Sequence, residues 1–433
     1  MIAQIIFILL FSAAVYFFAV NIKKIRRNIN LGKPLDRTDR PKERWMTMAL
    51  VALGQSKMVV RPVAGIMHIF IYVGFVIINI EVLEIIIDGI AGTHRVFSFL
   101  GSFYNFLIGS FEILAVLTLV ACFVFLARRN VLKLKRFRMR EMTSFPRSDA
   151  NAILITEILL MTAFLTMNAT DSVLQSRNFE HYITAGAFPV SGIYATLFSG
   201  LSSDALMMIE RTCWWFHIFG ILAFLNYLPY SKHFHILLAF PNVYYSNLEQ
   251  KGKFTNMGSV TQEVKLMLDP AATVPEGYQS PTSFGAKDVH DLTWKNLMDA
   301  YSCTECGRCS SVCPANQTGK LLSPRKIMMD TRDRLEEVGK NIDAHGKDFH
   351  DEKNLFNYIK EEELLACTSC NACTEACPVN IDPLNIITEM RRYLVMEQSK
   401  MPGEWQMMMN KIETNGAPWQ FAQSDRANWA NND

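Results

Sequence analysis

The sequence predicts an all-α protein in two parts, a bundle of five transmembrane helices and a polar, cysteine-rich helical domain. Half of the 433 residues are apolar, but the long apolar runs are confined to the first 240 residues. Eight of the ten cysteines fall within 75 residues in the polar part, in two blocks of identical spacing. A composition shift of this size is typical of a domain boundary.

Five segments are long and apolar enough to cross a bilayer, which takes about 20 residues. The first is interpreted as a retained anchor and not as a cleaved signal peptide, because it has no basic start and is followed by Lys23, Lys24, Arg26 and Arg27. The expected spans are residues 2–20, 62–88, 104–127, 152–173 and 205–229.

The loops predict the orientation of these spans. Residues 21–61 hold eleven Lys and Arg and residues 128–150 hold eight, whereas residues 89–103 and 174–204 hold one each. Because basic loops stay in the cytoplasm, the N-terminus is expected outside an inner (cytoplasmic) membrane and the cysteine-rich domain inside the cell. This explains the basic clusters by topology, so nucleic-acid binding is not expected.

The two cysteine blocks predict two [4Fe-4S] clusters. Each block has the spacing C-x2-C-x2-C-x3-C-P, in which the fourth cysteine binds the other cluster. Cluster one is therefore expected to use Cys303, Cys306, Cys309 and Cys377, and cluster two Cys367, Cys370, Cys373 and Cys313. A zinc site would instead place two cysteine pairs at each ion. Nearby Lys and Arg side chains are expected to be solvated.

The cysteine blocks are separated by 53 residues, which indicates a helical version of a two-cluster domain. Helices are expected near 324–340 and 351–365. Ser323 before Pro324 and Asp382 before Pro383 are typical helix starts, with a capping side chain followed by proline in the first turn.

Three of the nine histidines are candidate haem ligands. His68 lies in the second span, His217 in the fifth, and His235 just beyond it. An ionisable residue inside a span needs a partner, and two histidines on neighbouring helices can bind one haem iron. The sequence predicts a haem b at His68 and His217. A second haem at His235 stays open, with Met58 as one available partner; the alternative is that His235 lies at the membrane interface.

Five glutamates also lie in the predicted spans: Glu81, Glu84, Glu112, Glu157 and Glu210. Some could exchange protons at a quinone site, because quinone chemistry moves protons as well as electrons. The alternative is pairing between helices, for instance of Glu210 with Arg211.

These residues together resemble known membrane redox subunits. The first part resembles the cytochrome b subunit of the respiratory nitrate reductase and heterodisulfide reductase families, on His68, His217, His235 and the Pro-Tyr-Ser-Lys-x-x-His element at 229–235. That family has five spans, with haem ligands on the second and fifth. It has a further histidine where this sequence has Met58, which is a departure from the pattern.

The second part resembles the ferredoxin-like region of heterodisulfide reductase-like and electron-transfer-flavoprotein:quinone oxidoreductase-like proteins. The matching stretches are 284–286, 291–294, 303–313 and 318–324. The resemblance implies cysteine-rich CCG domains after this region. None is present here, so a separate cytoplasmic CCG-domain subunit, or a flavoprotein, is expected as the partner. The expected domains are 1–240 (membrane), 241–290 (linker), 291–400 (ferredoxin) and 401–433 (partner-docking tail).

The function expected from this is electron transfer between the quinone pool and a cytoplasmic redox partner, through haem b and two clusters. No residue pattern indicates a nucleophile or a hydride-transfer site. One alternative is a haem-free membrane anchor that carries the ferredoxin domain. Another is an ion-translocating module that uses the buried glutamates.

Overall fold

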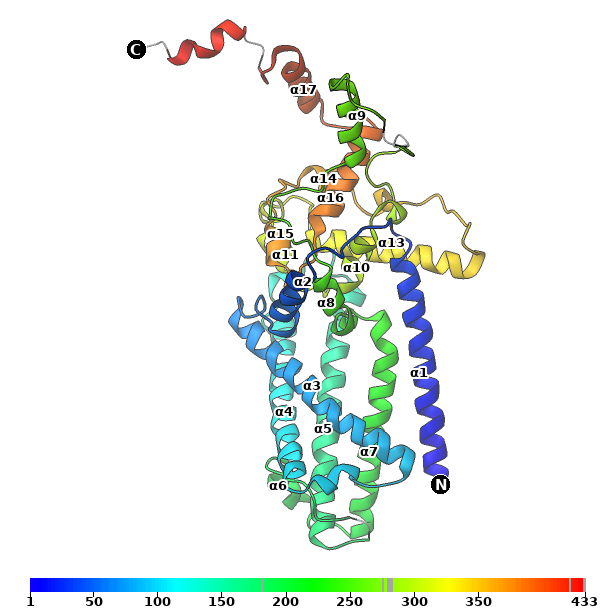
Figure 1. Cartoon of the computed structure of the whole chain (residues 1–433). Coiled ribbons are helices and arrows are strands. Elements are labelled where there is room, and N and C mark those ends of the chain that lie inside the picture. The colour runs from blue at the N-terminus through cyan, green and yellow to red at the C-terminus, as the bar shows by residue number, and fades with distance from the viewer. Residues whose placement is uncertain (181, 275, 279–282, 420–421, 431–433) are drawn as a thin grey trace.

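The computed structural model describes the whole chain except residues 181, 275, 279–282, 420–421 and 431–433. The described residues form helices and connecting loops and no strand. One isolated bridge pairs Lys33 with Thr293. An elongated helical bundle forms one end of the molecule and a cap of shorter helices the other (Figure 1). We call the end of the bundle that carries the cap the cluster end, and the opposite end of the bundle the far end.

The five predicted spans are confirmed as helices long and apolar enough to cross a membrane. Two of them run well beyond the expected span, because α1 continues into polar residues at its end and α5 begins in polar residues before the apolar run. The helices are α1 (Ile2–Ile29), α3 (Pro62–Ala91), α4 (Ser102–Leu126), α5 (Ser144–Ser176) and α7 (Ser203–Tyr227).

Helix α5 lies at the centre of the bundle, packed against both α4 and α7, and α3 packs against α4. Helix α1 lies at the edge, where it contacts α3 and α7 (Figure 1). The buried core is aromatic and aliphatic, with Phe7, Ile78, Phe111, Phe164 and Trp214 among its members.

The cap consists of short helices that surround the two cysteine blocks. They are α2 (Pro41–Met48), α8 (His235–Tyr244), α10 (Trp294–Ser302), α11 (Arg308–Val312), α12 (Pro314–Gln317), α13 (Pro324–His345), α14 (Glu361–Leu365), α15 (Ala372–Ala376) and α16 (Pro383–Arg392). Helices α9 (Gly258–Leu268) and α17 (Gly403–Asn415) bury none of their residues and project from the cap (Figure 1).

Both helix starts predicted at a proline are confirmed. The Ser323 hydroxyl accepts from the Lys326 amide, and the Asp382 carboxylate from the Asn385 amide at 3.1 Å. The helix expected over 351–365 is wrong, because only a 3-10 turn at 355–357 and the short α14 form there. Arg334 accounts for the difference: it donates to Asp351 at 2.6 Å and to the Lys353 carbonyl at 2.7 Å, contacts that hold this segment in a loop.

The composition boundary near residue 240 is not a boundary in the packing. Ile25 and Ile29 at the end of α1 belong to the same buried core as Leu297 and Tyr301 of α10. Asn28 of α1 donates to the Tyr301 hydroxyl at 3.0 Å. The cap is thus built partly from α1, the first of the long apolar helices, which fixes its position on the bundle.

Candidate redox centres

The two cysteine loops have the same backbone conformation. In the first, Glu305 and Gly307 have left-handed φ angles of 53° and 69°; in the second, Ser369 and Asn371 at the matching positions have 56° and 61°. Each loop then enters a five-residue helix, α11 or α15, that ends at the fourth cysteine of its block. The repeated spacing therefore encodes a repeated structure, and α11 packs against α15.

This packing brings cysteines of one block next to those of the other. The Cys309 thiol lies close enough to four others for their charges to interact: Cys306, Cys303, Cys377 and Cys373. In the same way Cys313 interacts with Cys367 and Cys370 of the second block. Cys377 therefore lies near cysteines of the first block, and Cys313 lies near cysteines of the second.

The chemistry of these groups suits iron–sulfur clusters. All eight cysteines are free of disulfides. Within the described residues, no three His, Cys, Asp or Glu side chains converge as the ligands of a single ion would. A four-iron cluster spreads its thiolates over different irons, so it does not require that convergence.

Two arginines beside the loops are engaged with backbone carbonyls, contrary to the expectation that such residues are solvated. Arg308 is buried and donates to the Lys57 carbonyl at 2.8 Å and the Met58 carbonyl at 3.2 Å. Arg391 donates to the carbonyls of Leu364 (2.7 Å) and Cys367. These arginines tie the cysteine loops to their surroundings through carbonyl groups, which hydropathy does not reveal.

The structure pairs His68 with His235. Their ring centres are 6.3 Å apart, and Arg308 lies close enough to His68 for their charges to interact. His235 Nδ1 lies 3.1 Å from the Lys232 carbonyl, which leaves Nε2 as the free nitrogen. His68 Nδ1 is buried without a hydrogen-bond partner. His233 was not among the candidate ligands predicted from the sequence, and its ring centre lies 5.6 Å from that of His235.

The sequence predicted that His68 pairs with His217, whereas in the structure His68 lies beside His235. His217 is buried in α7, with Nδ1 3.0 Å from the Leu160 carbonyl and its ring 6.1 Å from Phe164. The reason lies in the chain after it: α7 ends at Tyr227, and two 3-10 turns redirect the backbone before α8 starts at His235. Because no continuous helix joins them, His217 and His235 share no helix face. Met58 Sδ accepts from Arg308 at 3.5 Å.

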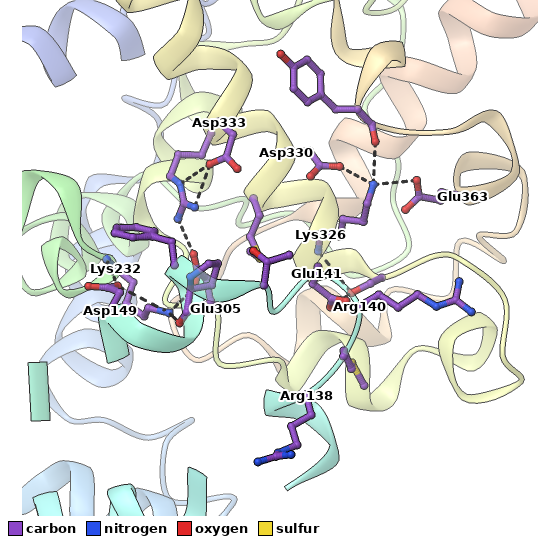
Figure 2. A pocket seen from close by; sticks show the side chains of 18 of the residues that line it. Arg138, Arg140, Glu141, Asp149, Lys232, Glu305, Lys326, Asp330, Asp333 and Glu363 are labelled. Atoms are coloured by element: carbon purple, nitrogen blue, oxygen red, sulfur yellow. Dashed lines mark hydrogen bonds and ion pairs between the residues drawn. The ribbon is translucent and has the colours of Figure 1, made fainter. Parts of the chain in front are cut away.

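Buried ion pairs connect the first cysteine loop to the bundle (Figure 2). Lys232, just before His235, pairs with Glu305, and Glu305 also pairs with Arg332 at 2.9 Å. Burial opposes the charge on Glu305, but Lys232 and Arg332 outweigh it and lower its pKa. Arg325 is fully buried, pairs with Glu141 at 2.7 Å and donates to the Glu305 carbonyl at 3.3 Å. A charged cavity of about 890 Å³ is lined by Glu141, Lys232, Glu305 and Arg332.

Four of the five candidate glutamates lie in buried positions, and three of those are hydrogen-bonded. Glu84 accepts from the Tyr104 hydroxyl at 2.9 Å, and Glu112 from the Val190 amide at 2.8 Å. Glu210 pairs with Arg211, the alternative predicted from the sequence. Glu81 Oε2 is buried without a partner. Glu157 is half-buried.

Comparison with known proteins identifies the cysteine-rich region. Residues 299–381 match the 4Fe-4S dicluster domain family. The chain is 29% identical to the probable iron-sulfur-binding oxidoreductase FadF of Bacillus subtilis, over 98% of this chain and 60% of that protein. It is 28% identical to the EtfAB:quinone oxidoreductase of Syntrophomonas wolfei, over 91% of this chain and 55% of that protein. The chain therefore spans less than two thirds of the length of either relative.

Other relatives match over a shorter part of the chain. A subunit of the ferredoxin/F420H2-dependent CoB-CoM heterodisulfide reductase of Methanosarcina acetivorans is 31% identical over 24% of this chain and 52% of that subunit. No solved structure matches the chain. The chain thus carries a 4Fe-4S dicluster domain on a bundle of apolar helices, and its relatives are iron–sulfur oxidoreductases and subunits of such complexes.

Proposed function

We propose that this chain carries electrons between a membrane quinone and a cytoplasmic redox partner, through one haem b and two [4Fe-4S] clusters. The observation that carries the proposal is the pairing of His68 and His235 beside the first cysteine loop. With iron–nitrogen bonds of about 2 Å on each side, as for other metals bound by imidazole, the 6.3 Å between the ring centres leaves room for one iron.

In this proposal His68 and His235 hold the haem, while His217 lies outside that pair. Cluster one has Cys303, Cys306, Cys309 and Cys377 as ligands, and cluster two has Cys367, Cys370, Cys373 and Cys313. Haem and clusters supply one-electron transfer when bound, and the protein supplies position, burial and charge. The cations near cluster one favour its reduced, more negative state; they are Lys57, Arg136 and Arg308.

The positions of the proposed cofactor ligands support a route for electrons through the protein. The first cysteine loop contacts the residues that precede α3, because Arg61 donates to Ser311 at 2.7 Å and Arg308 to Met58. In the second block Cys370 is exposed. Electrons would therefore pass between the haem and cluster one, and between cluster two and a partner at the cap surface.

The partner we propose is a cytoplasmic iron–sulfur subunit or flavoprotein. Support comes from the relatives, which include separate heterodisulfide reductase subunits and an oxidoreductase named for EtfAB. Helix α17 presents Trp405, Met407 and Met409 to solvent and is the proposed docking element. The basic loops at the cluster end support a cytoplasmic position of the cap.

The test is a reduced-minus-oxidised optical spectrum of the purified protein, with haem and iron quantified together. We expect a b-type band, one haem per chain, and about eight further irons, as two four-iron clusters require. Eight irons without haem would replace the proposal by the alternative of a membrane anchor carrying a ferredoxin domain. Loss of haem in His235→Ala, with the clusters retained, would assign the ligand.

A further inference from the structure

We infer that the quinone binds in a cavity at the cluster end of the bundle, between α1, α8, α10 and the segment 30–38, which we call the strap. This inference rests on the proposed exchange of electrons with a quinone and adds the place where it occurs. The cavity has a volume of about 450 Å³, within the range of small-molecule sites. Its apolar walls come from membrane helix α1 (Ile22, Ile25, Ile29) and from Leu238 and Met298 in the cap.

The cavity has a rigid aromatic wall. The rings of Tyr245 and Trp294 meet edge to face with their centres 5.2 Å apart. Trp294 Nε1 donates to the Leu35 carbonyl of the strap at 2.9 Å, which fixes the orientation of the indole. Phe234 adds a third, buried ring. Flat aromatic side chains stack against flat ligands, and a quinone head group is a flat ring.

The cavity also offers guanidinium hydrogen-bond donors. Arg26 and Arg37 line it, and within the described residues neither forms an ion pair. Arg37 Nε is buried without a hydrogen-bond partner. A buried donor gains free energy when it finds an acceptor. A quinone presents two carbonyl acceptors on an apolar ring, which matches a mainly apolar site with a few donors at its rim.

The position of the cavity suits electron exchange with the proposed cofactors. Phe234 directly precedes His235, and Leu238 follows one helical turn later in α8. Met298 precedes Cys303 by five residues, or about 7 Å along α10. Helices α8 and α10 pack together where α1 meets the cap (Figure 1). A quinone here would lie beside both the paired histidines and a ligand of cluster one.

A second aromatic cavity, of about 600 Å³, lies at the far end and is lined by Phe7, Trp214, Trp215 and Arg211. It is less suited to direct electron exchange because it lies far from the paired histidines. Asp88, which also lines it, is twenty residues from His68 on the same helix α3, or about 30 Å. Electron tunnelling weakens steeply with distance, so the cavity at the cluster end is the one favoured for this role.

The first experiment locates the ligand directly. The full-length protein with its cofactors is photolabelled with a short-chain azido-naphthoquinone, with and without excess unlabelled naphthoquinone, and the labelled peptides are mapped. We expect competed label in residues 22–38, 234–245 and 294–298. Competed label in residues 88–98 or 211–215 would overturn the inference. Label in the cavity at the cluster end that excess naphthoquinone does not displace would also overturn it, because a lipid would then account for the occupancy.

The second experiment separates this inference from the proposed function. Protein reduced with dithionite is mixed with a short-chain naphthoquinone, which takes two electrons from the clusters and two protons from water to become the quinol. Return of cluster absorbance gives the rate. Leu238→Trp narrows the cavity at the cluster end, and the matched control Ser98→Trp narrows the one at the far end. The total absorbance change with dithionite checks that each variant holds its clusters.

We expect Leu238→Trp to slow oxidation at least about tenfold at low quinone, the effect of losing about 1.4 kcal/mol of binding free energy, while Ser98→Trp keeps the wild-type rate. The reverse result would overturn the inference and leave the proposed function intact. If the wild-type protein were not oxidised at all, the proposed function would fail instead. Should Leu238→Trp lose its clusters, Thr38→Trp, whose native side chain is exposed and lines the same cavity, takes its place.

Discussion

Replacing Glu141 by alanine should loosen the attachment of the cap to the bundle. Glu141 lies in the segment between α4 and α5, and its side chain is only 6% exposed. One of its oxygens accepts from Arg325 Nε at 3.0 Å and Nη2 at 2.7 Å, and from the Ser323 hydroxyl at 2.6 Å. The substitution leaves the fully buried Arg325 guanidinium without its counter-charge.

Removing one partner of a buried ion pair costs about 3–5 kcal/mol, because the remaining charge stays desolvated. For a chain of 433 residues 1 kcal/mol shifts the melting temperature by about 1 °C, so the Tm of Glu141→Ala should fall by about 3–5 °C. Thermal unfolding of the purified protein with its cofactors, followed by circular dichroism and by loss of cluster absorbance, measures this shift.

The double variant Glu141→Ala with Arg325→Met is the control. Removing both charges should recover part of the loss, since no unpaired charge is left in the interface. Two results would refute the reasoning: a single variant within 1 °C of wild type, or a double variant whose loss equals the sum of the two single losses. Either would mean that the pair contributes no coupling free energy between the bundle and the cap.

Four further predictions concern pH, the proposed cofactor ligands and the strap. Arg325 lowers the pKa of Glu141 against the effect of burial. The stabilisation of the folded protein by the Glu141 carboxylate is therefore complete above the ordinary pKa of 4.5, and it is lost as pH falls through the lowered pKa. The Tm difference between wild type and Glu141→Gln should shrink in that pH range. His217→Ala should keep the haem, as measured by pyridine haemochrome, because His217 is not paired with His68. Cys377→Ser should remove the electron paramagnetic resonance signal of cluster one and leave that of cluster two, although Cys377 lies in the second cysteine block. Gly32→Val should destabilise the strap, since a Cβ at Gly32 would lie 2.5 Å from the Trp294 backbone nitrogen; faster hydrogen exchange at residues 30–38 is the readout.

The parts of the fold that follow from local chemistry could be predicted from the sequence. Apolar runs of about 20 residues predict spanning helices, because the bilayer leaves the backbone few alternatives. All five spans were found this way. The cysteine spacing was equally informative, since two-residue gaps define a tight loop whatever surrounds it. The sequence by itself therefore determined the helical class, the five spans and the dicluster domain.

The parts that depend on long-range packing were decided only by the tertiary structure. His235 lies beside His68 because two 3-10 turns after Tyr227 redirect the chain, and no local pattern reports where such a turn points. Arg308 and Arg325 were indistinguishable in sequence from solvated basic residues, yet they are buried because carbonyls and a carboxylate from distant loops meet them. Helix and loop formation depends on neighbours in sequence, whereas pairing of side chains depends on neighbours in space, and only the folded chain defines the latter.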